Sequence, residues 1–353
     1  MLRRRLSAAL LPAALALTVG TATPAIAADS GSVTAASTTA TTTTANPVTM
    51  PAGTPFGTTS AWRQDIRKAP LHPNSAAMVK NVAAQTAKLY GGVAAFNVTR
   101  YNTSFYTVPA GQKRIDLKWN DCQGKGKTPA GLFGPGGQFV QVPIPADAVP
   151  APGTDGQLTV FSPSTDQLWE FWKAKKVDGR WQACWGGRID GVSTDRGGFS
   201  GTFGASASGL ALAGGTIGIK DVQSGSIQHA VALHLPKPGR GYSYPATRGD
   251  GWDTSAAAVP EGTRLRLDPS VDVDKLSLHP IAKMVAEAAQ KYGFIVTDTS
   301  GCTSVVAESP AASIARTGTN PWTSLMGGTP QYSIMANFPW GKLQALPKNY
   351  GKP

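Results

Sequence analysis

The chain has 353 residues, of which 41% are hydrophobic and only 15% are charged, and its formal net charge is +12. The apolar fraction is high enough for a packed core and the 40 glycines follow no three-residue period, which excludes a wholly disordered chain and a collagen-like chain. Low charge combined with many Gly, Pro, Ser and Thr residues favours short strands joined by turns, so the composition predicts a mainly β protein.

The N-terminal segment has the pattern of an export signal. Three arginines at positions 3–5 precede an apolar run at 10–19, and residues 25–27 read Ala-Ile-Ala, a small-x-small cleavage motif. The apolar run is well short of the roughly 20 residues that cross a bilayer. We therefore expect residues 1–27 to be a signal peptide, and the mature protein to be secreted, extracellular and without a membrane span.

The next segment differs in composition from everything after it. Residues 28–58 are rich in Thr, Ala and Ser and offer little to bury, so we expect a disordered linker there. No later low-complexity stretch divides the chain. We therefore expect one globular domain over residues 59–353, mainly β with a β-sandwich or jelly-roll-like arrangement and with two or more peripheral helices.

The first of these helices is predicted after Asn74, a residue type that favours the position before a helix. Met78, Val79 and Val82 lie on one apolar stripe, and the pair of glycines at 91–92 marks the end of the helix.

A β-hairpin is predicted around residues 178–179, which read Asp-Gly, the strongest short signal for a two-residue hairpin turn. If these are the two loop residues, Glu170 lies opposite Gly187 and Trp172 lies opposite Trp185. Because side chains alternate across a strand, Glu170 and Trp172 are expected on one face together with Trp181 and Trp185.

A carboxyl group among tryptophans is the main functional signal in the chain. Flat aromatic rings stack on sugars, and partial burial raises the pKa of a carboxyl group towards the value that a general acid needs. We therefore predict a saccharide cleft in which Trp172, Trp181 and Trp185 bind the ligand and Glu170 is the acid or the nucleophile. The alternative is a β-sandwich core of aromatic cross-strand pairs, in which Glu170 pairs with Arg or Lys.

Glycoside hydrolysis usually needs a second carboxyl group, about 5 to 5.5 Å away for retention or about 6.5 to 9.5 Å away for inversion. Asp190 is the nearest candidate along the ladder, but it lies on the opposite face unless a bulge at the neighbouring glycines turns it. Its alternative role is to cap the following turn. His229, on a predicted strand at 226–235, is the second assisting candidate, although a histidine on an apolar face also suits a core position.

The loop at residues 239–253 mixes aromatic and charged side chains with glycine and proline. Tyr244, Arg248, Asp250 and Trp252 form a set suited to gripping a polar ligand from the rim of a sheet, and a plain surface loop is the alternative.

A second helix has Pro280 in its first turn and ends at Gly293. It leads into strand candidates at 294–297 and 305–306, which a Ser-Gly turn separates.

Three cysteines in an oxidising compartment allow one disulfide and leave one thiol. Of the three possible pairs we choose Cys122 with Cys184, which leaves Cys302 free, although the sequence does not decide among them.

Motifs for other kinds of chemistry are absent. Phosphate-loop, dinucleotide and zinc spacings do not occur, so we expect no cofactor and no metal. The basic residues are scattered and show no nucleic-acid-binding signature, although the basic excess suits an anionic cell wall or glycan.

Several short motifs give the chain a resemblance to a group of secreted actinobacterial proteins. These motifs are residues 168–172 (LWEFW), 183–188 (ACWGGR), 207–210 (ASGL), 227–231 (IQHAV) and 338–340 (FPW). The resemblance covers residues 62–346. It implies export and a single domain, and it implies no activity and no site residue.

Taken together, the residues predict a secreted carbohydrate-active protein that acts on a polysaccharide as a glycoside hydrolase, rather than as a lyase, in a Trp-lined cleft. The alternative is a non-catalytic protein that binds a cell wall or glycan with the same aromatic side chains. An adhesive protein with a protein partner is the third hypothesis.

Overall fold

The computed structural model describes residues 49–353. The expected signal peptide, residues 1–27, and residues 28–48 of the expected linker lie outside the described residues. Within the described part, fifteen strands form mixed sheets and six α-helices accompany them. The number of strands is compatible with the expected mainly β composition, whereas the sandwich arrangement and the peripheral position of the helices stay predictions. None of the helices in this part is both long enough and apolar enough to span a bilayer.

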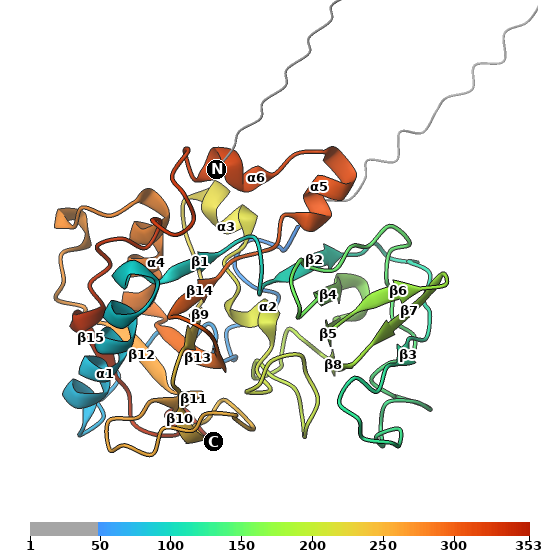
Figure 1. Cartoon of the computed structure of the whole chain (residues 1–353), viewed down its shortest axis with the longest axis horizontal. Coiled ribbons are helices and arrows are strands. Elements are labelled where there is room, and N and C mark those ends of the chain that lie inside the picture. The colour runs from blue at the N-terminus through green and yellow to red at the C-terminus, as the bar shows by residue number, and fades with distance from the viewer. Residues whose placement is uncertain (1–48) are drawn as a thin grey trace, which may run out of the picture. The chain divides into compact units, whose positions relative to one another are not determined.

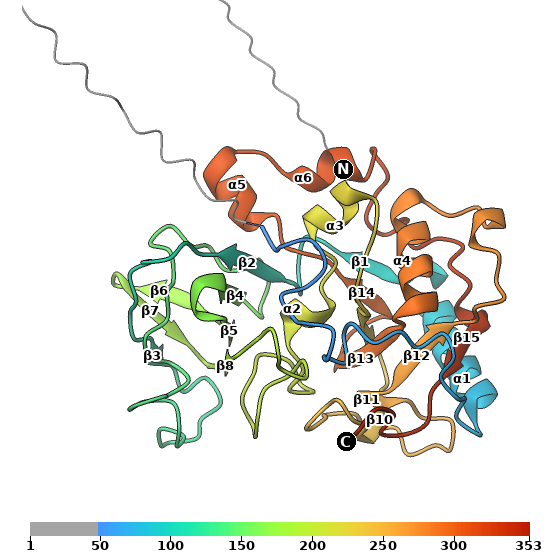
Figure 2. The same cartoon turned by 180° about the vertical axis from the view of Figure 1, so that it is seen from behind.

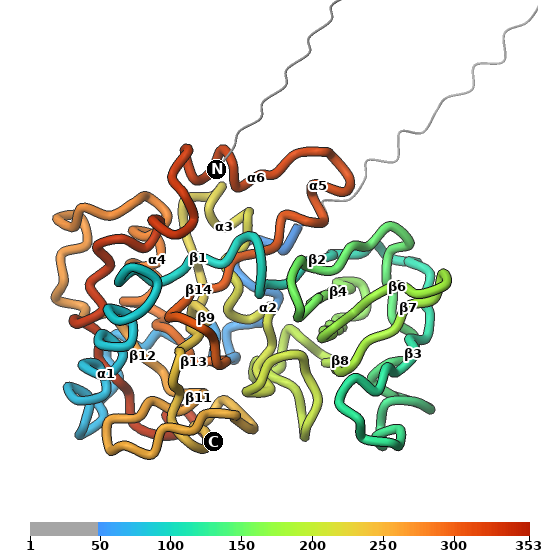
Figure 3. Tube along the Cα trace, in the orientation of Figure 1, coloured from blue at the N-terminus to red at the C-terminus, as the bar shows by residue number. Residues whose placement is uncertain are grey.

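The largest sheet has six strands and combines parallel and antiparallel pairs (Figure 1). Its central pair, β9 and β13, is parallel, so the carboxyl ends of these two strands lie at the same edge. Segments from the two ends of the described chain meet in this sheet, because β1 pairs with β14 (Figure 3). The strands in spatial order are β1 (Ala95–Asn97), β14 (Ser304–Val306), β9 (Val231–Leu235), β13 (Phe294–Thr299), β12 (Arg264–Leu267) and β15 (Leu343–Ala345).

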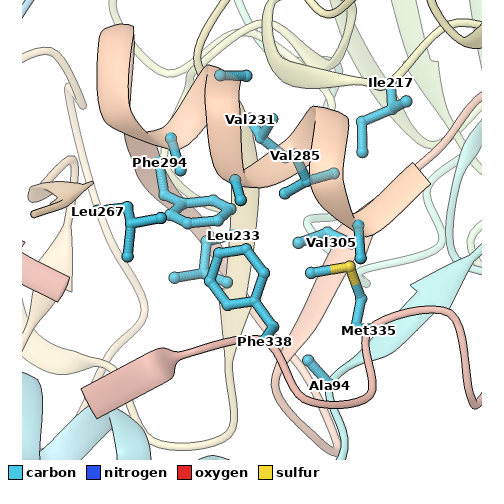
Figure 4. Packing of buried hydrophobic residues seen from close by; sticks show 14 of the residues in the cluster. Ala94, Ile217, Val231, Leu233, Leu267, Val285, Phe294, Val305, Met335 and Phe338 are labelled. Carbon is cyan, nitrogen blue, oxygen red and sulfur yellow. The ribbon is translucent and has the colours of Figure 1, made fainter. Parts of the chain in front are cut away.

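Two longer helices pack with this sheet, and both are the helices that the sequence predicts. Helix α1 (Ser75–Lys88) begins directly after Asn74, and α4 (Pro280–Lys291) has its proline at the first position. The side chain of His279 accepts a hydrogen bond from the N–H of Ile281 and so caps α4. Val285 of α4 packs in one apolar cluster with residues of the sheet and of the C-terminal segment (Figure 4).

The second part of the fold contains the predicted hairpin, divided between two smaller sheets. The expected register is confirmed, since Glu170 lies opposite Gly187 and Trp172 lies opposite Trp185. The four-stranded sheet has the order β2 (Thr103–Thr107), β4 (Gln157–Ser162), β5 (Gln167–Trp172) and β8 (Trp185–Asp190). The three-stranded sheet has the order β3 (Lys118–Trp119), β7 (Arg180–Ala183) and β6 (Lys175–Val177).

The prediction that Trp181 lies on the same face as Glu170 is wrong. Lys173 has a φ of 51°, a left-handed conformation that is uncommon for a residue other than glycine, and it interrupts the alternation of side chains between β5 and β6. Trp181 therefore packs in the same apolar cluster as Trp169 and Phe171, which lie on the opposite face of β5 from Glu170.

The remaining elements are short helices, one further pair of strands and several 3-10 turns. Helix α2 lies between the six-stranded and four-stranded sheets in both views (Figures 1 and 2). The short helices are α2 (Leu212–Gly215), α3 (Ile219–Ser224), α5 (Ala311–Thr317) and α6 (Pro321–Leu325). A parallel pair is formed by β10 (Gly239–Tyr242) and β11 (Pro260–Glu261). Four 3-10 turns span Tyr90–Gly92, Pro163–Thr165, Val273–Lys275 and Trp340–Lys342.

Residues 49–58, which the sequence assigns to the linker, instead pack into the interior. Met50 and Phe56 are buried in an apolar cluster. The N–H of Met50 donates to Oε1 of Glu308 at 3.1 Å, and the N–H of Gly53 donates to Oδ1 of Asp221 at 2.6 Å. The packed part thus begins before residue 59, because these apolar side chains and backbone groups find partners that lie far away in the sequence.

Candidate functional site

The candidate site is a cavity of about 950 Å³ that is lined by residues of both parts of the fold. His234 of β9 and Asp298 of β13 line it near the carboxyl ends of the central parallel pair. Trp172 of β5 and Trp185 of β8 line it from the four-stranded sheet. The volume is within the range of about 300–1,000 Å³ that is usual for small-molecule sites, and the edge with strand carboxyl ends is a usual place for them.

A bulge in β13 brings Asp298 to this cavity. Val296 pairs with Leu233 of β9, but the next pair is Asp298 with His234, so Thr297 is an extra residue. Strict alternation would put Asp298 on the face of Val296, which packs in the helix-covered core. The extra residue moves Asp298 to the face of His234, and both side chains line the cavity.

Two further carboxyl groups lie beside Asp298. Asp250 comes from the loop after β10 and also lines the cavity, whereas Glu261 of β11 is completely buried. One oxygen of each of the three groups lies within 4.8 Å of an oxygen of the others. The three carboxyl groups are therefore close enough to influence one another's protonation, and their oxygens are spaced as they would be around one cation.

Hydrogen bonds fix the two carboxyl groups that line the cavity. Asp298 accepts the N–H of Ala207 at 3.2 Å on Oδ2 and the N–H of Thr299 at 2.9 Å on Oδ1. The hydroxyl of Thr299 donates to Oδ1 of Asp250 at 2.6 Å. Thr299 thus bridges the two groups, since its backbone binds Asp298 and its side chain binds Asp250.

The surroundings favour proton binding at two of the three groups. Burial raises the pKa of Asp298 to about 7, and the nearby charge of Asp250 acts in the same direction. Burial, together with the side chain of Asp250, raises the pKa of Glu261 to about 9. Burial lowers the pKa of His234 to about 4, so this imidazole is neutral at neutral pH. The cavity therefore contains a carboxyl group, Asp298, whose pKa is suited to proton donation near neutral pH.

Both tryptophans of the cavity contact other side chains through their ring surfaces. Phe203 stacks on Trp185 with a centroid distance of 5.7 Å, and Nζ of Lys125 lies 4.0 Å from the Trp185 centroid. Nζ of Lys173 lies 4.5 Å from the centroid of Trp172. A sugar that stacks on the ring face occupied by one of these lysines displaces it, and an exposed cation–π contact of this kind contributes only about 0.5–1 kcal/mol.

Asp155 and Arg248 support the cavity wall. The indole N–H of Trp172 donates to Oδ1 of Asp155 at 3.1 Å. The guanidinium of Arg248 donates to the carbonyl oxygens of Phe203 and Ser206 at 2.6 and 2.7 Å, and so holds the glycine-containing loop that lines the cavity.

The structure does not bring Glu170 to this cavity. Its side chain is fully buried, and its carboxyl oxygens accept the N–H groups of Leu212 at 2.9 Å and Ala213 at 2.8 Å. These donors are the first N–H groups of α2, which have no partner within the helix. Burial raises the pKa of Glu170 to about 7, as the sequence suggests, but the group has no access to a ligand.

Asp190 and His229, the two residues expected to assist Glu170, do not line the cavity either. Asp190 is exposed at the end of β8 and pairs with Arg188 at 2.8 Å. His229 precedes β9 rather than lying in it, is fully buried, and contacts Asp221 through Nε2 at 3.2 Å. The structure thus does not bring Glu170, Asp190 and His229 together.

Of the predicted ligand-binding residues, four line the cavity and three do not. Trp172, Trp185, Arg248 and Asp250 are among its lining residues. Trp181 is buried in a core cluster, Trp252 is half exposed outside the cavity, and Tyr244 lies outside it with its N–H bound to the side chain of Asn349.

The predicted disulfide is present and adjoins the cavity. Cys122 and Cys184 are bonded with a Cα–Cα distance of 5.5 Å, and Cys302 is the free cysteine. The bond ties the loop that carries Lys125 to the residue before Trp185. Cys302 itself lines the cavity.

Sequence reasoning missed Asp298 and Glu261. The signal for Asp298 is its position near the carboxyl end of a predicted apolar strand and just before a Ser-Gly turn, where a polar side chain is often functional. No local signal marks Glu261, which follows a proline in a loop-rich stretch.

The chain matches no protein-family model, no curated protein and no solved structure.

Proposed function

We propose that the protein is an exported carbohydrate-active hydrolase that cleaves a polysaccharide in this cavity. The observation that supports the proposal most strongly is the pair Asp250 and Asp298, which line one cavity with their nearest oxygens within 4.8 Å. Trp172 and Trp185 line the same cavity and supply flat apolar surface for a sugar ring.

In this proposal Asp298 is the general acid. Its raised pKa keeps a large share of the group protonated up to about pH 7, so it can donate a proton to the glycosidic oxygen as the bond to the leaving sugar breaks. Asp250 is exposed to the cavity and attacks the anomeric carbon, which forms a glycosyl ester. Water then hydrolyses the ester, Asp298 takes a proton from that water, and both side chains return to their starting states.

The separation of the two groups predicts the stereochemistry. Retaining enzymes have carboxyl groups about 5 to 5.5 Å apart, whereas inverting enzymes need about 6.5 to 9.5 Å to accommodate a water molecule. We assign the Asp250–Asp298 pair to the retaining class because their nearest oxygens lie within 4.8 Å, which leaves little room for a water molecule between them. We expect ¹H NMR of the first products to show the same anomeric configuration as the substrate, and initial release of the opposite anomer contradicts this assignment.

Export is the second part of the proposal. It is supported by the arginine-led apolar segment at residues 1–27 and by the disulfide between Cys122 and Cys184, because disulfides persist in oxidising compartments. Detection of the protein in the culture medium, with its N-terminus starting near residue 28, tests this part.

A non-catalytic glycan-binding protein is the alternative, and the basic excess of the chain favours it where the partner is an acidic cell wall. Incubation with plant, fungal and bacterial polysaccharides separates the two functions. Release of new reducing ends supports the hydrolase. Retention of the protein on an insoluble polysaccharide without any release supports the binding protein instead.

A further inference from the structure

Glu261 contacts the backbone of Asp250 and has no surface exposed to solvent. Its side chain is fully buried, and its Oε2 accepts the N–H of Asp250 at 3.3 Å. Gly249 permits this close approach of the loop, since a Cβ at that position would lie 2.7 Å from Oε2 of Glu261. The loop that carries Asp250 is therefore fitted against the carboxyl group of Glu261.

The charge of this cluster is not balanced by a contact ion pair. Among residues 49–353, no Lys, Arg or His nitrogen lies within 4.0 Å of a carboxyl oxygen of Asp250, Glu261 or Asp298. Arg248 is the nearby cation that acts on Asp298 and Glu261 through space, but its hydrogen bonds go to backbone carbonyls. Three ionised carboxylates at this spacing would repel one another, and one of them is out of water.

One oxygen of Glu261 has no hydrogen-bond partner. Oε1 is buried, and no donor among the described residues reaches it. A buried carboxylate oxygen without a donor is costly, whereas a protonated carboxyl group removes the charge and gains a hydroxyl that can itself donate. The neighbouring carboxylate of Asp250 is the acceptor for this hydroxyl, because the side chains of Glu261 and Asp250 lie in hydrogen-bond contact.

We infer that Glu261 is a neutral acid whose hydroxyl donates a hydrogen bond to Asp250, and that it acts as a positioning residue which keeps Asp250 ionised and directed towards Asp298. This inference rests on the proposed hydrolase for its role in the reaction, but the protonation of Glu261 stands apart from any activity. Burial and the neighbouring side chain of Asp250 raise the pKa of Glu261 in the direction that this assignment requires.

A bound cation is the competing explanation, and the structure favours the proton. Ca²⁺ takes about six to eight oxygen ligands, whereas this cluster offers three carboxyl groups, one of which is enclosed. The positive charge of Arg248, which acts on two of the three groups, opposes a second cation.

The protonation state can be measured without a substrate because the chain has only four glutamates. Glutamate labelled with ¹³C at Cδ gives four carboxyl signals, and the Glu261→Gln variant identifies the one from Glu261. We expect that signal to remain that of a protonated carboxyl group at pH 7, with Glu287, which is exposed on α4, as the ionised reference. An ionised Glu261 at pH 7 overturns the inference, as does a shift of its signal together with a higher melting temperature on addition of CaCl₂ or MgCl₂.

Turnover, once a substrate is found, tests the positioning role. Glu261→Gln keeps a donor towards Asp250, so we expect its kcat to stay within about threefold of the wild type. Glu261→Leu removes the donor, so we expect kcat to fall by roughly tenfold to a hundredfold, the range for loss of a hydrogen bond to a charged group, and the acid limb of the pH profile to move to higher pH. Equal losses in the two variants, or no loss in either, contradict the role. Absence of turnover in the wild type defeats the hydrolase while the NMR result remains valid.

Discussion

Replacement of Asp298 by Asn is expected to lower kcat by roughly a hundredfold to ten-thousandfold, the contribution usual for a general acid. Asn has nearly the same shape and keeps an oxygen for the N–H of either Ala207 or Thr299, while its NH₂ group faces the other N–H; we therefore expect some loss of stability but a folded protein that still binds the glycan. What the variant lacks is the proton. Wild-type activity is correspondingly expected to decline as the pH rises through about 7, where Asp298 loses that proton.

The matched control for this variant is Asp190→Asn. Asp190 is also an aspartate of this protein. It is exposed, it pairs with Arg188, and it does not line the cavity. We expect the control to keep wild-type kcat and the Asp298 variant to bind glycan without cleaving it. Comparable turnover in the two variants removes Asp298 from the mechanism.

Replacement of Glu170 is expected to affect stability rather than activity. Its two carboxyl oxygens satisfy the first N–H groups of α2, and the site is fully buried. Gln supplies one acceptor and places an NH₂ group against the remaining N–H donor. The free energy of unfolding is therefore expected to fall by about 2–4 kcal/mol in Glu170→Gln, measured by urea denaturation.

The exposed Glu287 on α4 provides the comparison. Glu287→Gln is expected to change the free energy of unfolding by no more than about 0.5 kcal/mol, as is usual for a surface position. The folded fraction of Glu170→Gln is expected to keep the wild-type kcat. A variant of Glu170 that is as stable as the wild type but inactive would restore the catalytic role that the sequence suggests for this residue.

Features that depend on neighbouring residues could be predicted from the sequence. The Asp-Gly turn determines the hairpin register, so the position of Trp172 opposite Trp185 follows from counting along the two strands. Asn74 and Pro280 correctly predict where α1 and α4 begin, although the side chain of Asn74 makes no capping hydrogen bond, and the following glycines predict the helix ends to within a few residues. Trp172 and Trp185 both line the cavity because they lie on the same face of the four-stranded sheet, where β5 ends and β8 begins.

Features that depend on distant partners could not be predicted. Glu170 is removed from solvent by α2, whose first residues come more than 40 positions later in the chain. Asp298 reaches the cavity only because of the bulge at Thr297, and the strand pattern alone gives the opposite face. The cluster itself combines a loop, the short strand β11 and the end of β13, so its three carboxyl groups share no local motif.

The location of the glycan site is the claim on which the rest depends, and the indole N–H signals of the nine tryptophans test it directly. In ¹H–¹⁵N spectra recorded with cellulose, chitin, xylan and β-glucan oligosaccharides, we expect at least one of these ligands to shift the signals of Trp172 and Trp185, as assigned with Phe variants. The signals of the core residues Trp62 and Trp322 are expected to stay unchanged. A ligand that shifts only the signal of Trp252, which is exposed outside the cavity, contradicts the account.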